Sequence, residues 1–132
     1  MASPSYSSPK PSGGVELWAW LFMRLSGLAL LGLALGHLVL MHLLNNVDQI
    51  DYDFVAGRYA GWFWRGYDLL MLILAMGHGL NGVRILIDDY VSPPGPRRLA
   101  VRLLYVVGGV FLALGIIAIV CFKPVSATPS PP

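Results

Sequence analysis

Three long apolar stretches dominate the pattern of hydrophobic and polar positions. They run over about residues 17–44, 66–87 and 101–122. A helix that crosses the hydrocarbon core of a bilayer needs about 20 mainly apolar residues, because each residue adds about 1.5 Å. The third stretch meets this most plainly, with no charged residue over 103–122. Because a helix satisfies its own backbone groups in lipid, we expect three transmembrane helices.

The second stretch meets the same condition less simply. It is uncharged only over residues 69–83, between Asp68 and Arg84. It can span a membrane if these two residues lie near the two interfaces or inside a protein-lined cavity. The segment SPPGP at 92–96 separates it from the third stretch, because proline cannot continue a helix.

The two ends of the chain differ from the part between them. Residues 1–14 and 124–132 are rich in Ser, Pro and Gly and cannot bury a core, so we expect them to be disordered. The membrane domain therefore covers residues 15–123.

Composition narrows the class of protein. The 132 residues are 56% hydrophobic and only 12% charged, with a mean hydropathy of +0.65 and a net charge of +2. Soluble domains carry about 25% charged residues. This composition excludes a disordered chain, a disulfide scaffold and a nucleic-acid-binding protein. The single cysteine, Cys121, excludes an internal disulfide.

The distribution of basic residues predicts the orientation. Six lie on the side of the N-terminus and of the connection between spans two and three, against three on the other side. The six are Lys10, Arg24, Arg84, Arg97, Arg98 and Arg102. Because cytoplasmic loops are rich in Lys and Arg, we expect a cytoplasmic N-terminus and an outside C-terminus. The loop 45–65 would then lie on the outer surface. The fold class is an all-α membrane protein with three transmembrane helices.

His78 is the most informative polar residue, because it lies near the middle of span two. A neutral imidazole is a good axial ligand for haem iron. Gly82 lies one turn further on the same face, and Gly79 is adjacent, so a flat macrocycle could approach the helix. A hydrogen bond to a neighbouring helix and a proton relay are the alternatives.

His37 in span one is the candidate for a second haem ligand. It lies nearer the outside than His78, by about 10 Å. His42 lies about 140° around the helix from His37, so the two cannot share one metal. His42 is also near the outer end of the span, where it can meet water. The two depths suit two stacked haems.

Further polar residues lie near the cytoplasmic ends of the spans. Arg24 and Arg84 could extend to the lipid headgroups, or hold haem propionates or a quinone oxygen. The phenol of Tyr90 can donate to a carbonyl oxygen, and Asp89 can relay protons. The Ser26 hydroxyl could bond a headgroup or only its own backbone.

Three helices with so few histidines cannot enclose a haem alone. A site with two axial histidines therefore needs a ligand from another chain. The residues themselves indicate a three-helix subunit that is incomplete without a partner and carries b-type haem.

Two motifs resemble those of a known family. His78, Gly82, Asp89 and Tyr90 match the pattern H-x3-G-x6-D-Y in the second helix of the membrane-anchor subunits of succinate dehydrogenase, respiratory complex II. The stretch 24–27 resembles the R-x-S-G element of the first helix. The resemblance covers about residues 17–122. It is closest to the smaller of the two hydrophobic anchors, in its Gram-positive, actinobacterial-like form.

The resemblance implies roles for individual residues. His78 takes the position of the haem b axial ligand, and His37 that of the first-helix histidine in two-haem members, which usually reduce menaquinone. Tyr90 takes the position of the quinone-site tyrosine, with Asp89 beside it. Near the quinone and the haem propionates, the resemblance also places Arg24 and Ser26.

One position departs from the family pattern. Some anchors have a serine contact to quinone four residues before the arginine, where this chain has Trp20. The indole could fill a cytoplasmic-side quinone pocket, which favours a distal quinone site.

The resemblance also implies partners and a location. We expect a second anchor, an iron–sulfur subunit and a flavoprotein that oxidises succinate, together in the cytoplasmic membrane. Trimers of whole complexes occur in the family. The arginines at 97, 98 and 102 would dock the iron–sulfur subunit or bind anionic lipid. A fumarate reductase anchor and a cofactor-free structural subunit are the alternative functions.

Overall fold

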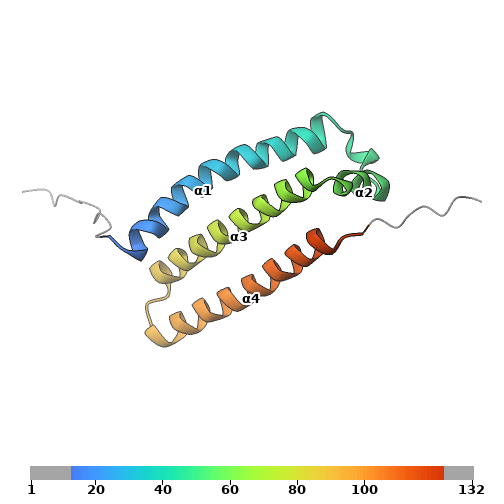
Figure 1. The fold of residues 1–132 in the computed structure, drawn as a ribbon. Coiled ribbons are helices and arrows are strands. Elements are labelled where there is room, and N and C mark those ends of the chain that lie inside the picture. The colour runs from blue at the N-terminus through green and yellow to red at the C-terminus, as the bar shows by residue number, and fades with distance from the viewer. Residues whose placement is uncertain (1–12, 124–132) are drawn as a thin grey trace, which may run out of the picture.

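The computed structural model describes residues 13–123 and shows three long helices in a single layer (Figure 1). They are α1 (Val15–Leu38), α3 (Trp62–Tyr90) and α4 (Pro94–Cys121). Helix α3 lies in the middle and packs against both α1 and α4. The tails that we expected to be disordered are residues 1–14 and 124–132. Except for the two glycines at 13–14, they lie outside the described residues.

Three helical segments are long and apolar enough to cross a membrane, in agreement with the three predicted spans. They are Leu17–Leu43, Trp62–Tyr90 and Pro94–Cys121. The first includes a short π-helix, η1 (Val39–Leu43), that continues α1. Helix α4 begins well before the apolar run, because a proline in the first turn removes only an N–H that has no helical acceptor.

The segment expected to be a loop between spans one and two contains helical structure. A 3-10 turn, η2 (Val47–Gln49), precedes the short helix α2 (Tyr52–Ala60). The Asp51 carboxylate starts α2 by accepting a hydrogen bond from the Phe54 backbone N–H at 2.9 Å. Helix α2 and the end of α4 lie at one end of the layer, opposite the start of α1 and the α3–α4 connection (Figure 1).

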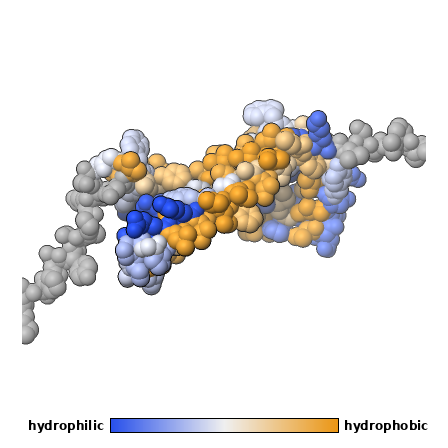
Figure 2. Space-filling view, turned by 90° about the horizontal axis from the view of Figure 1, so that it is seen from below, coloured by the Kyte–Doolittle hydropathy of each residue, from blue (hydrophilic) through white to orange (hydrophobic). Residues whose placement is uncertain are grey.

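The described chain has almost no interior of its own. Ser26 and Gly108 are its two buried residues, and no large hydrophobic side chain in this part is buried. Figure 2 shows hydrophobic surface across the middle of the molecule and hydrophilic residues toward its ends. A soluble monomer rarely exposes so wide an apolar surface. The flanks of the helices therefore meet lipid or other subunits.

Small residues allow α4 to approach α3 closely. A Cβ atom at Gly108 would lie 2.3 Å from Cδ2 of Leu80, and one at Gly115 would lie 2.7 Å from Cδ2 of Leu72. The two glycines are seven residues apart and so lie on the same face of α4. Without a hydrophobic effect between helices in lipid, such close contacts supply much of the association.

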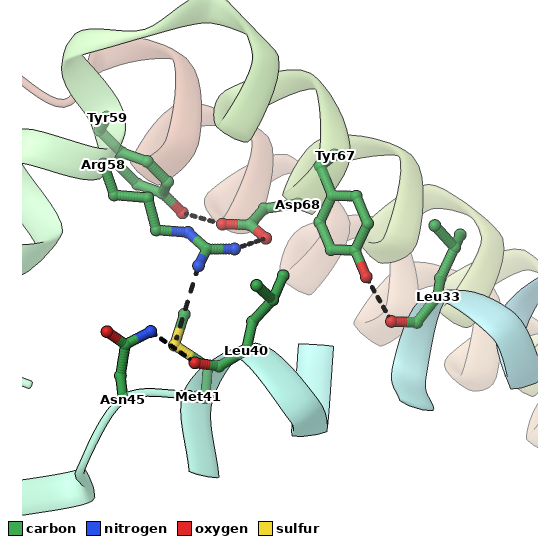
Figure 3. Close-up of polar contacts among 8 residues, drawn as sticks. All are labelled: Leu33, Leu40, Met41, Asn45, Arg58, Tyr59, Tyr67 and Asp68. Atoms are coloured by element: carbon green, nitrogen blue, oxygen red, sulfur yellow. Dashed lines mark hydrogen bonds and ion pairs between the residues drawn. The ribbon is translucent and has the colours of Figure 1, made fainter. Parts of the chain in front are cut away.

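A polar cluster at the α2 end surrounds Asp68, one of the two charged residues that bound the uncharged part of the second span (Figure 3). The Arg58 guanidinium lies 3.6 Å from the Asp68 carboxylate, and the Tyr59 hydroxyl donates to the same carboxylate at 3.0 Å. The side chains of Arg58 and Asp68 are only 7% and 13% exposed. The Arg58 guanidinium also lies 4.0 Å from the centre of the Trp64 ring. Asp68 is thus accommodated by an opposite charge and a hydrogen bond.

Hydrogen bonds from Arg65 connect the end of α4 to the same region. Its guanidinium donates to the backbone carbonyls of Val120 at 3.1 Å and Phe122 at 2.8 Å, and also to that of Tyr59 at 2.6 Å. The last carbonyls of a helix have no partner within the helix, so these bonds cap α4. On the other side of α3, the Tyr67 hydroxyl donates to the Leu33 carbonyl of α1 (Figure 3).

The close contact at Gly108 predicts a contrast between two neighbouring glycines. Gly108→Ala should lower the free energy of unfolding by about 1–3 kcal/mol, because the new methyl group overlaps Leu80. Gly109→Ala is the matched control, since nothing lies within 4 Å of its Cβ position. Thermal unfolding of the purified protein in detergent measures both. Equal stabilities of the two variants would contradict the proposed packing.

The Tyr59 hydroxyl predicts a dependence of stability on alkaline pH. Burial and the Asp68 carboxylate raise the pKa of Tyr59 above its usual value of 10.0. The folded protein therefore holds this proton more tightly than the unfolded chain. The resulting stabilisation is complete below about pH 10 and is lost as the pH rises through the folded pKa.

Tyr59→Phe removes this contribution. The stability difference between the wild type and Tyr59→Phe should be constant below about pH 10 and shrink above it. Unfolding measured from about pH 8 to about pH 11 on both proteins checks this. A difference that grows with pH would contradict it.

Candidate functional site

The contact between α1 and α3 brings Ser26 and His78 together. The Ser26 hydroxyl oxygen lies 2.9 Å from Nδ1 of His78. Ser26 is only 3% exposed and His78 is half-buried. A Cβ atom at the next residue of α1, Gly27, would lie 3.2 Å from Cε1 of the same ring. The absence of a side chain at Gly27 therefore lets the imidazole lie against the backbone of α1.

The surroundings of the Ser26 hydroxyl indicate which tautomer His78 adopts. The hydroxyl also lies 3.5 Å from the Met23 carbonyl oxygen, to which it can donate its proton. It then accepts from the imidazole, so the proton is on Nδ1 and the lone pair on Nε2. Within residues 13–123, Nε2 has no hydrogen-bond partner. A histidine held through one nitrogen in this way presents the other as a ligand.

The small residues near His78 do not all face the same neighbour. Gly77 lies against the ring of Phe22, with 3.1 Å between its Cβ position and Cζ. Gly82 faces Met23, whose Cε would lie 3.8 Å from its Cβ position. Gly79 faces open space. Of the two glycines noted in the sequence beside His78, Gly82 therefore serves the α1–α3 contact and Gly79 leaves the helix surface open.

Two grooves lie between α1 and α3 on the side of the N-terminus. One has a volume of about 340 Å³ and an almost wholly apolar lining, and it includes Ser26. Its other lining residues are Trp18, Leu21, Phe22, Leu25, Ala29 and Leu74. The second has a volume of about 290 Å³ and brings the polar side chains of Asn81 and Arg84 next to Trp20. The first groove suits an apolar group, and the second offers hydrogen-bond donors.

Both span arginines lie near Trp20, Arg24 stacked on its ring and Arg84 in the same groove. The guanidinium of Arg24, which is exposed, lies 4.0 Å from the centre of the Trp20 ring, as in a cation–π pair. Arg84 is half-buried, and its Nε is buried without a hydrogen-bond partner among the described residues. An unpaired buried N–H is costly, so Arg84 is suited to a group supplied from outside the chain.

The predicted residues at the end of α3 are separate from this site. Asp89 and Tyr90 are exposed, Tyr90 by 83%, and neither lines the two grooves. Their roles at a quinone site stay predictions.

The two histidines of α1 and η1 lie well apart from His78. His37 is in the last turn of α1 and is half-buried. It is ten residues beyond Gly27, which contacts His78, so it lies about 15 Å further along the helix. His42 is exposed in η1. The two candidate haem ligands therefore lie at different levels along α1.

The sequence alone did not indicate two features of the site. The Ser26 hydroxyl was expected to meet a headgroup or its own backbone; it does lie 3.5 Å from the Met23 carbonyl oxygen, but it also bonds His78 across 52 residues of chain. No sequence pattern singled out Asn81, which shares a groove with Arg84. Ser26 and Asn81 are both polar residues inside an apolar span, where a hydrogen-bonding partner is expected, and this position could have pointed to them.

The sequence was compared with those of known proteins. The family profile described as the succinate dehydrogenase/fumarate reductase transmembrane subunit matches residues 3–118. The chain belongs to this family. It is therefore a multi-pass anchor of the cytoplasmic membrane that associates with the other subunits of a succinate dehydrogenase or fumarate reductase complex. No curated protein sequence matches the chain significantly.

The Ser26–His78 hydrogen bond predicts a measurable coupling in this anchor. Ser26→Ala, His78→Ala and the double variant form a mutant cycle, and the coupling free energy should be about 1 kcal/mol. Ser26→Thr keeps the hydroxyl and is the control. The measurement is the unfolding of the purified complex in detergent. A coupling free energy of zero would contradict the hydrogen bond.

Proposed function

We propose that this protein is the smaller, cytochrome b anchor of a succinate:menaquinone oxidoreductase, and that His78 is an axial ligand of haem b. The observation that carries the proposal is the Ser26–His78 hydrogen bond of 2.9 Å. It fixes the orientation of the imidazole and directs the Nε2 lone pair away from Ser26. Haem b, when bound, supplies a one-electron relay between the iron–sulfur subunit and quinone.

The surroundings of His78 fit such a group. Gly27 and Gly79 leave backbone without side chains near the imidazole, and the groove along Ser26 offers an apolar lining. The second axial ligand has to come from the second membrane anchor, because three helices in one layer cannot surround a macrocycle. The site is therefore shared between two chains.

We propose His37 as a ligand of a second haem. Its distance of about 15 Å from the level of His78 along α1 separates the two sites into different depths. In the proposed orientation, with a cytoplasmic N-terminus, His37 is on the outer side. Electrons would pass from the iron–sulfur subunit to the depth of His78 and then to that of His37, toward a distal menaquinone.

The remaining polar residues would act on carboxylates and on quinone. The unpartnered Nε of Arg84 is suited to a propionate, and the Arg24 guanidinium, which stacks on Trp20, is a second candidate. The Ser26 hydroxyl is already hydrogen-bonded to Nδ1 of His78. At the end of α3, Asp89 and Tyr90 are exposed for contact with another subunit or a quinone there.

The position of the quinone can be tested separately from the haems. A distal site predicts inhibitor density at the level of His37. The groove between Trp20 and Arg84 is the competing site near the N-terminal side, because it combines an aromatic wall with hydrogen-bond donors. Inhibitor density in that groove, or beside Tyr90, would contradict the distal site.

The haem ligands are tested by replacing each histidine of the anchor in turn. In the purified complex, His78→Ala and His37→Ala should each remove about one b-type haem per chain, since each removes an axial ligand. The control is His42→Ala, which should keep both, because His42 is exposed in η1. The measurement is the reduced-minus-oxidised absorption spectrum with quantified haem.

Other spectra would overturn parts of this proposal. Absence of b-type bands in the wild type would favour a cofactor-free structural anchor. One haem per chain that survives His37→Ala would remove the role of His37. Oxidation of succinate by a soluble dye should be unchanged in every variant, because that chemistry is on the flavoprotein. A faster reduction of fumarate than oxidation of succinate would favour the fumarate reductase alternative.

A further inference from the structure

A basic groove lies at the end of the molecule that carries the α3–α4 connection, and Arg84 is the one lining residue that it shares with the sites proposed above. It has a volume of about 570 Å³ and lies between the last turns of α3 and the first turns of α4. Its lining residues are Arg84, Asp88, Arg97, Arg98, Val101 and Arg102. Four arginines face one aspartate here, so the groove carries an excess of three positive charges.

The chain itself neutralises little of this charge. Asp88 lies 3.9 Å from Arg97, and both side chains are more than 40% exposed, so this pair is weak. Arg98 donates through Nε to the Pro94 carbonyl, which leaves the rest of its guanidinium free. Among the described residues, Arg102 has no hydrogen bond or ion pair. The groove is therefore prepared for an anionic group from outside the chain.

The position of the arginines indicates where that group comes from. Arg98 and Arg102 are one turn apart on the same face of α4, and Tyr105, one turn further into the span, is 48% exposed. The groove thus runs along the side of a membrane helix and continues into apolar surface. In Figure 2 the hydrophilic surface at this end lies directly beside the hydrophobic surface. A phospholipid has the same order, with a charged headgroup followed by apolar acyl chains.

We propose that the basic groove binds the phosphate of an anionic phospholipid, whose acyl chains lie along α4. Guanidinium groups suit phosphate because their paired N–H donors match two phosphate oxygens. Basic pockets between transmembrane helices bind acidic headgroups in this way. An acidic segment of another subunit would mainly meet the end of the layer, whereas these arginines extend along its side. The proposal does not depend on haem or on the direction of the reaction.

The experiment measures lipid binding to the purified, delipidated whole complex by native mass spectrometry. The probes are phosphatidylglycerol, phosphatidylcholine and inorganic phosphate, each titrated separately. Phosphatidylglycerol should bind more tightly than phosphatidylcholine. Arg98→Gln and Arg102→Gln should each weaken phosphatidylglycerol binding about fivefold, and the double variant about 30-fold. Lys123→Gln removes an exposed charge at the opposite end and should leave binding unchanged.

The conservative variants separate the lost charge from disturbed folding. Arg98→Lys and Arg102→Lys keep the charge and should lose less affinity than the glutamine variants. Unchanged phosphatidylglycerol affinity in Arg98→Gln/Arg102→Gln overturns the proposal. Equal affinity for both lipids also overturns it, as does an equal loss in Lys123→Gln. Displacement of the lipid by inorganic phosphate at similar concentration would make free phosphate the ligand. Loss of a subunit from the double variant with unchanged lipid binding would make the groove a protein interface.

Discussion

The arrangement of the three helices in one layer constrains everything else in this protein. Helix α3 contacts α1 on one side and α4 on the other, and each contact depends on residues without bulky side chains, such as Gly27 against His78 and Gly108 against Leu80. A single layer leaves both broad faces without a protein partner from the chain itself. The large apolar residues are consequently exposed, as only a lipid-facing or subunit-facing helix can tolerate. The anchor holds its own helices together but needs other chains to complete a site.

The two ends of the layer satisfy their charges differently. At the α2 end the chain supplies both partners: Arg58 pairs with Asp68, and Arg65 caps the last turn of α4. At the other end Arg84 and Arg102 have no ion pair among the described residues. Because a charge near lipid needs a counter-charge or water, the first end is self-contained and the second is open to propionates, headgroups or other chains.

His78 connects these two properties of the layer. Its imidazole lies in the α1–α3 contact, where Ser26 and Gly27 determine its orientation, while Nε2 is left without a partner from the described chain. A histidine that served packing alone would gain from having both nitrogens bonded. The arrangement therefore supports a group that approaches from outside the chain, and the proposed shared haem site is consistent with the same single layer that leaves the faces open.

The sequence alone determined the three spans, because the thickness of a bilayer and the rise of a helix prescribe their length. It also singled out His78, a polar residue in an apolar run, and required Asp68 to lie near an interface or inside a protein-lined cavity. It did not reveal α2, whose nine residues have no long apolar pattern. Only the tertiary structure paired Asp68 with Arg58 and Ser26 with His78. Those pairs depend on the level at which two antiparallel helices meet. The geometry of the connections and the glycine contacts decide that level, and no local sequence pattern encodes it.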